Sequence, residues 1–195
     1  MKSLKGTKTA ENLMKSFAGE CQARTRYTYY ASVAKKEGYV QISNIFMETA
    51  EQEKEHAKRF YKFLKDDFAG EAIEITAGYP VDLYEDTAKN LKAAAAGENE
   101  EWTQLYPEFA RIAREEGFPA VAVAYERITE VENMHEDRYL KLLKNVEEGK
   151  VFKKDEVVLW KCSNCGYIFE GAEAPQACPA CLHPQSYFEL YTERY

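Results

Sequence analysis

The sequence predicts a mainly α-helical protein, in which a four-helix bundle with a long crossover precedes a small β-rich module that binds metal through four cysteines. Three observations support this fold class: apolar residues follow a helical period through most of residues 1–149, an internal repeat relates the two halves of that part, and two Cys-x-x-Cys pairs lie near the end of the chain. With 195 residues, 45% of them hydrophobic, the chain can form one substantial core and a small module. We therefore predict a bundle over residues 1–149 and a separate module over residues 150–195.

The first half of the predicted bundle is a pair of long helices. Apolar periodicity predicts one helix from about Thr9 to Lys36 and a second from about Val40 to Lys65. Gly38 is the expected stop between them, because glycine readily adopts the positive φ that ends many helices. At 1.5 Å per residue, helices of this size are about 40 Å long, which suits a bundle. The aperiodic segment 66–80 contains two glycines and a proline, so we expect it to be the crossover.

The second half of the bundle is predicted from its helix boundaries. Asp82, with Glu85 three residues later, has the pattern of an N-terminal cap for a third helix. That helix is expected to continue to about Glu116. Pro119 fits the first turn of a fourth helix, which should end near Gly149.

The two helix pairs are related by an internal repeat. The run Ala34–Gly38 recurs at Ala113–Gly117. Glu20 recurs as Glu98, at an offset that is one position shorter, so one extra residue lies in the second copy. A duplicated helix pair explains this similarity better than chance does, and an approximate two-fold axis would bring equivalent residues to one central site.

Each copy of the repeat contains Glu-x-x-His, a spacing that puts both side chains on one face of a helix. In four-helix bundles that bind two metal ions, two helices supply this motif and the other two supply further carboxylates. The predicted ligands are Glu20, Glu53, His56, Glu98, Glu101, Glu132 and His135. Five carboxylates with two imidazoles suit two iron or manganese ions better than zinc. The alternative is that these glutamates are surface charges. We favour metal because Glu20 lies on the same apolar stripe as Phe17, and a buried Glu needs a partner.

Other residues near the predicted ligands have more than one interpretation. Tyr27 and Tyr106 lie about two turns from Glu20 and Glu98 on the same face, so they are either core aromatics or hydrogen-bond donors to ligand carboxylates. For the glycines of the first and third helices, Gly19 and Gly97, close helix packing is preferred over room near the metals. Cys21 is expected to pack in the bundle, with peroxide-sensitive chemistry as the alternative.

The predicted C-terminal module depends on its metal ligands. Two Cys-x-x-Cys units indicate a tetrahedral site formed by Cys162, Cys165, Cys178 and Cys181. So small a module needs such a metal to fold, and the spacing leaves iron and zinc open. Residues 151–158 are expected to be a linker or first strand. The expected small core is Trp160, Tyr167, Phe169 and Phe188.

The charge and the apolar runs exclude some functions. The formal charge of −7 argues against a general nucleic-acid binder, which needs basic patches. No apolar run approaches the ~20 residues that span a bilayer, and the first residues lack the apolar stretch of a signal peptide. We therefore expect a cytoplasmic protein whose cysteines are metal ligands rather than disulfides.

These motifs together resemble the rubrerythrin family over essentially the whole chain. The first part is similar to its ferritin-like di-iron bundle, and Cys162-x-x-Cys165 with Cys178-x-x-Cys181 is similar to its rubredoxin-like domain, although Leu182 replaces a glycine often found there. The resemblance implies three irons per subunit, a di-iron-oxo centre and one Fe(Cys)4, with zinc as a possible substitute.

The resemblance also implies an activity and residue roles. It implies a peroxidase that reduces hydrogen peroxide to water in oxidative stress defence, supplied with electrons by rubredoxin or an NAD(P)H-dependent reductase, in a homodimer or higher oligomer. Glu53 and Glu132 would bridge the irons, and one iron would exchange His56 for Glu101 with oxidation state. Terminal ligands would be Glu20, Glu98 and His135, and tyrosines contacting the ligands would be Tyr27 and Tyr106. The alternatives are a ferroxidase or iron-handling protein, and a bundle with a purely structural zinc ribbon.

Overall fold

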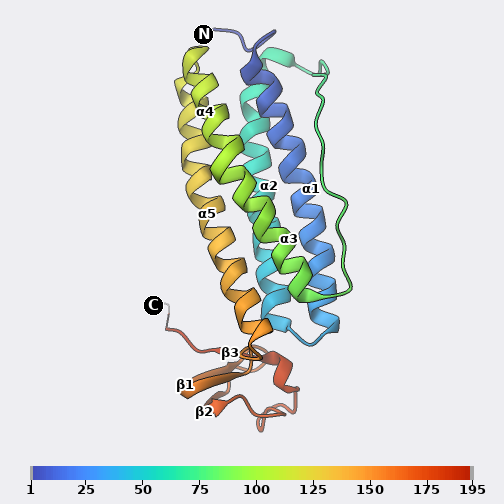
Figure 1. Cartoon of the computed structure of the whole chain (residues 1–195), viewed down its shortest axis with the longest axis vertical. Coiled ribbons are helices and arrows are strands. Elements are labelled where there is room, and N and C mark those ends of the chain that lie inside the picture. The colour runs from blue at the N-terminus through green and yellow to red at the C-terminus, as the bar shows by residue number, and fades with distance from the viewer. Residues whose placement is uncertain (1, 194–195) are drawn as a thin grey trace.

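The computed structural model describes residues 2–193 and contains four long helical rods with a small sheet at one end (Figure 1). In chain order the helical elements are α1 (Lys8–Lys36), α2 (Val40–Phe68), α3 (Thr87–Glu100), η1 (Glu101–Leu105), α4 (Tyr106–Glu115) and α5 (Pro119–Glu147). Helices α3, η1 and α4 follow one another as a single rod, and the crossover, residues 69–86, runs outside α1 along the length of the bundle (Figure 1). The predicted mainly α-helical fold with a long crossover is confirmed.

The turns between paired helices follow the sequence expectations. Gly38 ends the α1–α2 turn at φ 85°, and Gly117 ends the α4–α5 turn at φ 82°. Both angles lie in the left-handed region, which glycine adopts without the steric cost of a Cβ. Thr7 caps α1 by accepting a hydrogen bond from the backbone N–H of Ala10 at 3.2 Å.

The predicted cap of the third helix is wrong by one turn. Asp86, not Asp82, is the N-cap of α3, and it accepts a hydrogen bond from the backbone N–H of Lys89 at 2.8 Å. The carboxylate of Asp82 instead accepts from Arg26 at 2.8 Å and from the hydroxyl of Tyr30. Asp82 is therefore engaged by α1, and the helix begins at the next residue able to cap it.

The extra residue in the second repeat coincides with η1, which is a π-helical turn. A π-turn accommodates one inserted residue within a continuing helix. Glu98 and Tyr106 are eight positions apart, whereas their counterparts Glu20 and Tyr27 are seven apart. The π-turn absorbs this difference, so Glu98 and Tyr106 keep positions equivalent to those of Glu20 and Tyr27.

Two clusters of aromatic rings pack on either side of the bundle centre. In one, Tyr27 lies 5.6 Å from Tyr139 between ring centroids, and Phe46 lies 5.2 Å from Tyr139. The other cluster contains the equivalent residues of the opposite repeat copies. Tyr106 corresponds to Tyr27, Tyr125 to Phe46, and Phe60 to Tyr139. Sequence repeat and packing therefore share one approximate two-fold arrangement.

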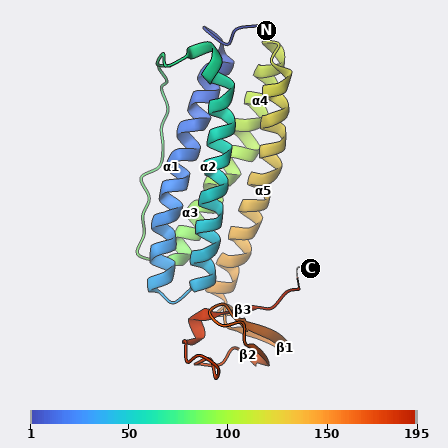
Figure 2. The same cartoon turned by 180° about the vertical axis from the view of Figure 1, so that it is seen from behind.

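The C-terminal part is an antiparallel sheet in the order β2-β1-β3, below the end of the bundle (Figure 1, Figure 2). Its elements are β1 (Lys153–Cys162), β2 (Ile168–Glu173), η2 (Gln185–Tyr187) and β3 (Phe188–Leu190). Trp160 and Phe188 are buried as expected, and Phe169 is half-buried beside them. Tyr167 is exposed, so its assignment to this core is wrong.

The residue before β1 contacts the turn between α1 and α2. The rings of Tyr39 and Phe152 stack with their centroids 6.2 Å apart and their planes at 10°. The division into domains at residues 149 and 150 stays a prediction.

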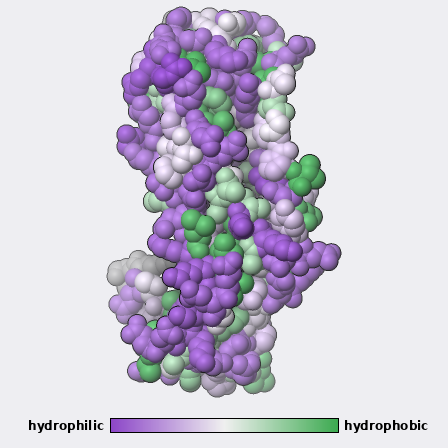
Figure 3. All heavy atoms as spheres, viewed as in Figure 1, coloured by the Kyte–Doolittle hydropathy of each residue, from purple (hydrophilic) through white to green (hydrophobic). Residues whose placement is uncertain are grey.

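The face seen in Figure 3 is mostly hydrophilic with small separate apolar patches. Among residues 2–193, none of the helices combines the length and the apolar character needed to cross a membrane.

Candidate metal centres

Six of the seven predicted bundle ligands converge at the middle of the bundle. They form two groups of four donors, and within each group the ligand atoms lie within 4.8 Å of one another. The groups share Glu53 and Glu132. The first group adds Glu20 and His56, and the second adds Glu98 and His135. Two shared carboxylates between two four-donor groups are the arrangement expected for a pair of bridged cations.

The donor atoms lack the hydrogen bonds that buried polar atoms normally make. Glu20, Glu53, Glu98 and Glu132 are almost fully buried, and each has at least one carboxylate oxygen without a hydrogen-bond partner among the described residues. Nδ1 of His135 is also without such a partner, although it lies 2.9 Å from Glu132 Oε2. Burying unpaired carboxylates is costly, and bound cations would remove that cost. An oxygen-rich donor set with one nitrogen in each group fits iron or manganese.

The two histidines of the site are held differently. Nε2 of His135 lies 2.9 Å from Gln52 Oε1, so a proton on Nε2 is donated to Gln52 and the Nδ1 lone pair is free for a metal. Nδ1 of His56 lies 2.9 Å from both Glu53 and Glu132. Its Nε2 makes no hydrogen bond within the part of the chain that the structure describes.

The repeat explains this difference. The offset that relates His56 to His135 also relates Gln52 to Val131, which has no side-chain acceptor, so His56 has no equivalent anchor. Gln52 is not among the predicted site residues, and this mismatch between the two repeat copies is the sequence signal that points to it.

Tyr27 and Tyr106 are buried core aromatics that also donate hydrogen bonds to ligand carboxylates, so both of their interpretations apply. The Tyr27 hydroxyl donates to Glu98 Oε1 at 2.5 Å, and the Tyr106 hydroxyl donates to Glu20 Oε1 at 2.5 Å. Burial and neighbouring carboxylates raise the pKa of both tyrosines well above the usual value. Both hydroxyls therefore remain protonated donors that orient the carboxylates.

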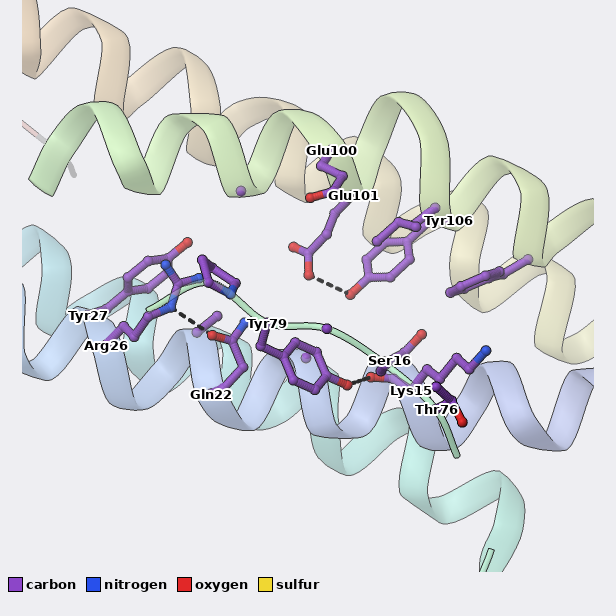
Figure 4. A pocket seen from close by; sticks show the side chains of 18 residues that line it. Lys15, Ser16, Gln22, Arg26, Tyr27, Thr76, Tyr79, Glu100, Glu101 and Tyr106 are labelled. Carbon is purple, nitrogen blue, oxygen red and sulfur yellow. Dashed lines mark hydrogen bonds between the residues drawn. The ribbon is translucent and has the colours of Figure 1, made fainter. Parts of the chain in front are cut away.

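Glu101 lies outside the two four-donor groups. It is half-buried at the start of η1, and its Oε1 lies 3.3 Å from the Tyr106 hydroxyl. It lines a cavity of about 360 Å³ between α1, the crossover and η1 (Figure 4). A Cβ added at Gly19 would lie 3.8 Å from both the Glu101 carboxylate and the Tyr79 ring. Both distances are ordinary van der Waals contacts, so a Cβ would fit at this position and the interpretation of Gly19 stays a prediction.

Without bound metal, the pKa values of the ligand carboxylates and imidazoles shift in different directions. Burial and then the charge of Glu53 raise the pKa of Glu98 to about 8. Burial also opposes ionisation of Glu53, but hydrogen bonds with His135 and His56 outweigh it and lower its pKa to about 2. Burial disfavours the charged form of both imidazoles, yet bonds to Glu132 and Glu53 raise the pKa of His56 to about 10 and that of His135 to about 12.

These shifts predict that the metal-free bundle loses stability as pH rises from about 6 to about 9. A raised pKa contributes stability that is complete below the unfolded-state pKa and is lost as pH rises through the folded-state value, here about 8 for Glu98 and about 10 for His56. The lowered pKa of Glu53, about 2, adds no pH dependence in this range. Urea unfolding followed by helical circular dichroism measures the effect, and the free energy of unfolding should be clearly lower at about pH 9 than at about pH 6.

The metal-loaded protein is the control for this prediction. Its ligands must lose protons to bind metal, so its stability should not fall over the same range. A metal-free protein equally stable at both ends of the range would contradict the assignment of these protons.

The four cysteines of the C-terminal module form a second donor group, the four-cysteine site. All four Sγ atoms lie within 4.8 Å of one another, and none of the thiols is in a disulfide. Matching turns present the two pairs. Gly166 N–H donates to Cys162 O at 2.8 Å with φ 80°, and Leu182 N–H donates to Cys178 O at 2.8 Å with φ 61°. Leu182 thus adopts the left-handed conformation that glycine favours, at a cost of about 1–2 kcal/mol, with its side chain exposed.

The fifth cysteine lies outside both donor groups. Cys21 is exposed on α1, so the expectation that it packs in the bundle is wrong. Position 21 points away from the face that carries Glu20, because neighbouring helix residues are separated by about 100°.

Comparison with known proteins agrees with this arrangement. The rubrerythrin family profile matches residues 11–143, and that of the rubrerythrin rubredoxin-like domain matches residues 160–189. The chain is 73% identical to rubrerythrin from Clostridium perfringens over 195 residues, covering 100% of both chains. It is 52% identical to rubrerythrin from Nitratidesulfovibrio vulgaris, covering 97% of both chains. Among solved structures, fully reduced all-ferrous nigerythrin aligns with a TM-score of 0.64 at 30% identity, covering 97% of this chain and 92% of that one.

The predicted fold and the cofactors are confirmed by these matches. The bundle is ferritin-like with a di-iron carboxylate site, and the sheet module is rubredoxin-like with a four-cysteine iron site. The chain therefore belongs to the rubrerythrin family, whose members are oxidoreductases with a di-iron site.

Proposed function

We propose that this protein reduces hydrogen peroxide to water at the di-iron site and that the iron of the four-cysteine site returns the electrons. The observation that carries the proposal is the presence, in one chain, of a buried two-metal carboxylate site and a separate four-thiolate site. When bound, the two ferrous irons supply the two electrons that, with two protons, convert one peroxide to two waters. A thiolate-bound iron is a one-electron carrier, so two transfers restore the site.

The protein side chains hold this site in one arrangement. We propose that Glu53 and Glu132 bridge the irons, because each belongs to both donor groups. Glu20, Glu98 and His135 would be terminal ligands, each fixed by a hydrogen bond from or to a second side chain. These outer bonds fix the orientation and charge of the ligands.

A second candidate function is that of a ferroxidase or iron-handling protein, which would use the same bundle to oxidise ferrous iron with oxygen. The four-cysteine site favours the peroxidase, because iron storage needs no route for returning electrons. Anaerobic reduction of the purified protein followed by stopped-flow mixing separates the two. We expect peroxide to reoxidise the di-iron site much faster than oxygen does. Equal rates, or accumulation of ferric mineral, would favour the ferroxidase.

We further propose that His56 and Glu101 exchange at one iron as its oxidation state changes. His56 lacks the anchor that Gln52 provides for His135, and Glu101 stands beside the site without belonging to either donor group. Replacing Glu101 with alanine should therefore lower iron retention after oxidation more than after reduction, measured by metal analysis after desalting. Glu108→Ala, which removes an exposed carboxylate of α4, is the matched control. Equal iron loss in both states would argue against exchange.

The distance between the bundle site and the C-terminal module bears on how electrons reach the irons. Twelve residues separate His135 from the end of α5 at Glu147, about 18 Å of helix, and the C-terminal module lies beyond that end. This separation supports transfer between subunits of a homodimer or higher oligomer, with rubredoxin or an NAD(P)H-dependent reductase as donor. We place the activity in the cytoplasm, where thiolate ligands stay reduced.

A further inference from the structure

The cavity beside Glu101 reaches the side chains that contact the metal ligands. Its inner wall includes Tyr27 and Tyr106, which donate to Glu98 and Glu20, together with Glu101 itself. In Figure 4, Glu101 points from η1 into the space between that segment and α1. Two further cavities lie at the surface, one beside Glu85 and one beside Glu74, and neither is lined by a predicted ligand.

The outer wall of this cavity is a short part of the crossover, residues 76–80. Tyr79 is the only large side chain of this wall, and its neighbours are threonine, alanine, glycine and proline. The Tyr79 ring is 39% exposed, and its hydroxyl donates to the backbone carbonyl of Lys15 at 3.0 Å. Tyr79 therefore stands between solvent and the cavity.

Few bonds hold this wall in place. Within the part of the chain that the structure describes, residues 72–81 make no backbone hydrogen bond, and the bond from Tyr79 to Lys15 is their one hydrogen bond to α1. The next attachment is Asp82, which pairs with Arg26. Ile73 packs against the apolar cluster that includes Leu64, so the wall at residues 76–80 is held between that contact and Asp82 by one exposed hydrogen bond. A segment held by so few bonds opens at low free-energy cost.

The lining carries side chains of both charge signs. Its basic side chains are Lys15 and Arg26 and its acidic ones are Glu100 and Glu101, so a small neutral molecule can enter without a counter-ion. A water molecule has about 30 Å³ of liquid volume, and hydrogen peroxide, with one more oxygen atom, needs only slightly more. The cavity, at about 360 Å³, holds several such molecules, so any selection by size must occur at its outer wall rather than inside it.

We propose that this cavity is the route by which peroxide reaches the di-iron site, and that Tyr79 limits the route to small peroxides. The proposal rests on the peroxidase function proposed above and adds the approach route and the residue that sets size specificity. Gly19 also lines this cavity, where a Cβ would make an ordinary van der Waals contact with the Tyr79 ring at 3.8 Å.

The test compares hydrogen peroxide with tert-butyl hydroperoxide as oxidants of the anaerobically reduced holoprotein. Both take two electrons and two protons, the bulky one giving an alcohol and water. In Tyr79→Ala the rate with tert-butyl hydroperoxide, relative to that with hydrogen peroxide, should rise at least tenfold. Tyr84→Ala is the matched control, because it removes an exposed tyrosine of the same crossover that does not line the cavity. Tyr79→Phe keeps the ring without the hydroxyl and should stay within threefold of the unchanged protein.

A second measurement tests the route without using activity. Ala23 is buried on the cavity wall, so Ala23→Cys places a thiol inside it. With Cys21 replaced by serine and the four-cysteine site loaded, a bulky maleimide should label that thiol at least tenfold faster when Tyr79→Ala is added, while a small thiosulfonate should label both at similar rates. Circular dichroism verifies folding, and Tyr79→Leu replaces Tyr79→Ala if the helix content changes.

The outcomes separate the two proposals. Unchanged oxidant ratios and unchanged labelling in Tyr79→Ala would overturn the role of Tyr79. If peroxide reoxidises no variant faster than oxygen does, the peroxidase function fails, and the labelling result alone then decides whether Tyr79 restricts the cavity.

Discussion

Replacing Glu132 with alanine is expected to remove both irons from the bundle. Glu132 belongs to both donor groups, and its two carboxylate oxygens lie 2.9 Å from the imidazoles of His56 and His135, so its loss removes a ligand from both groups at once. Loss of Glu132 leaves three donors in each group, with Glu53 as the one carboxylate that both groups still share. We expect bundle iron to fall from two per chain to near zero, and peroxide turnover to fall at least ~10³-fold, the scale seen when a group that acts as part of a catalytic unit is removed.

Metal analysis with the visible spectrum checks this result. The absorption of the four-cysteine iron should remain, because its ligands lie in the other module. Glu130→Ala, which removes a carboxylate two positions away on the same helix that belongs to neither donor group, should keep all three irons. Retention of two bundle irons in Glu132→Ala would show that Glu132 does not bridge them.

Replacing Cys178 with serine is expected to unfold the C-terminal module and disconnect the bundle from its electron supply. Cys178 is buried, and the core around it consists of few residues, with Trp160 and Phe188 as its largest buried side chains. A structural metal site of this type contributes about 10–16 kcal/mol, far more than so small a core supplies. We expect loss of the four-cysteine iron absorption, rapid hydrogen exchange over residues 153–190, and a drop of at least ~100-fold in NAD(P)H-linked turnover.

A single-turnover experiment separates electron supply from chemistry in this variant. Chemically reduced Cys178→Ser should still be reoxidised by peroxide at nearly the unchanged rate, because the bundle ligands are intact. Cys21→Ser, which removes the exposed thiol of α1, is the control and should affect neither measurement. If the variant lost reoxidation by peroxide as well, the C-terminal module would have a role in the peroxide step itself.

The helices and their order could be predicted because the signals are local. Helical periodicity, Gly38, Gly117 and Pro119 each act within a turn or two of the chain, and the structure has helix ends close to each. The predicted N-cap of the third helix was wrong because the signal that decides it is not local. Asp82 and Asp86 have equally suitable side chains, and the choice between them depends on Arg26, which lies 56 positions from Asp82.

The residues of the candidate site could be predicted from the sequence, but the contacts that distinguish one half of the site from the other could not. Two Glu-x-x-His motifs and the repeat are enough to name the ligand carboxylates and imidazoles, because helix geometry puts each pair on one face. Whether Tyr27 donates to a ligand or only packs depends on a partner in another helix, which proved to be Glu98. The roles of the ligands stay predictions until the variants above are measured.

The sequence by itself determined that this protein has a duplicated helix pair, a set of carboxylates and imidazoles in its middle, and a module with four cysteine ligands after it. These are matters of residue type, spacing and period. Only the tertiary structure decided that a π-turn absorbs the extra residue, that Gln52 holds His135 while His56 has no such anchor, and that Tyr79 lines the cavity beside Glu101. Each of these depends on atoms from helices or loops far apart in the chain, and a hydrogen bond or a cavity exists only once packing has brought them within a few ångströms.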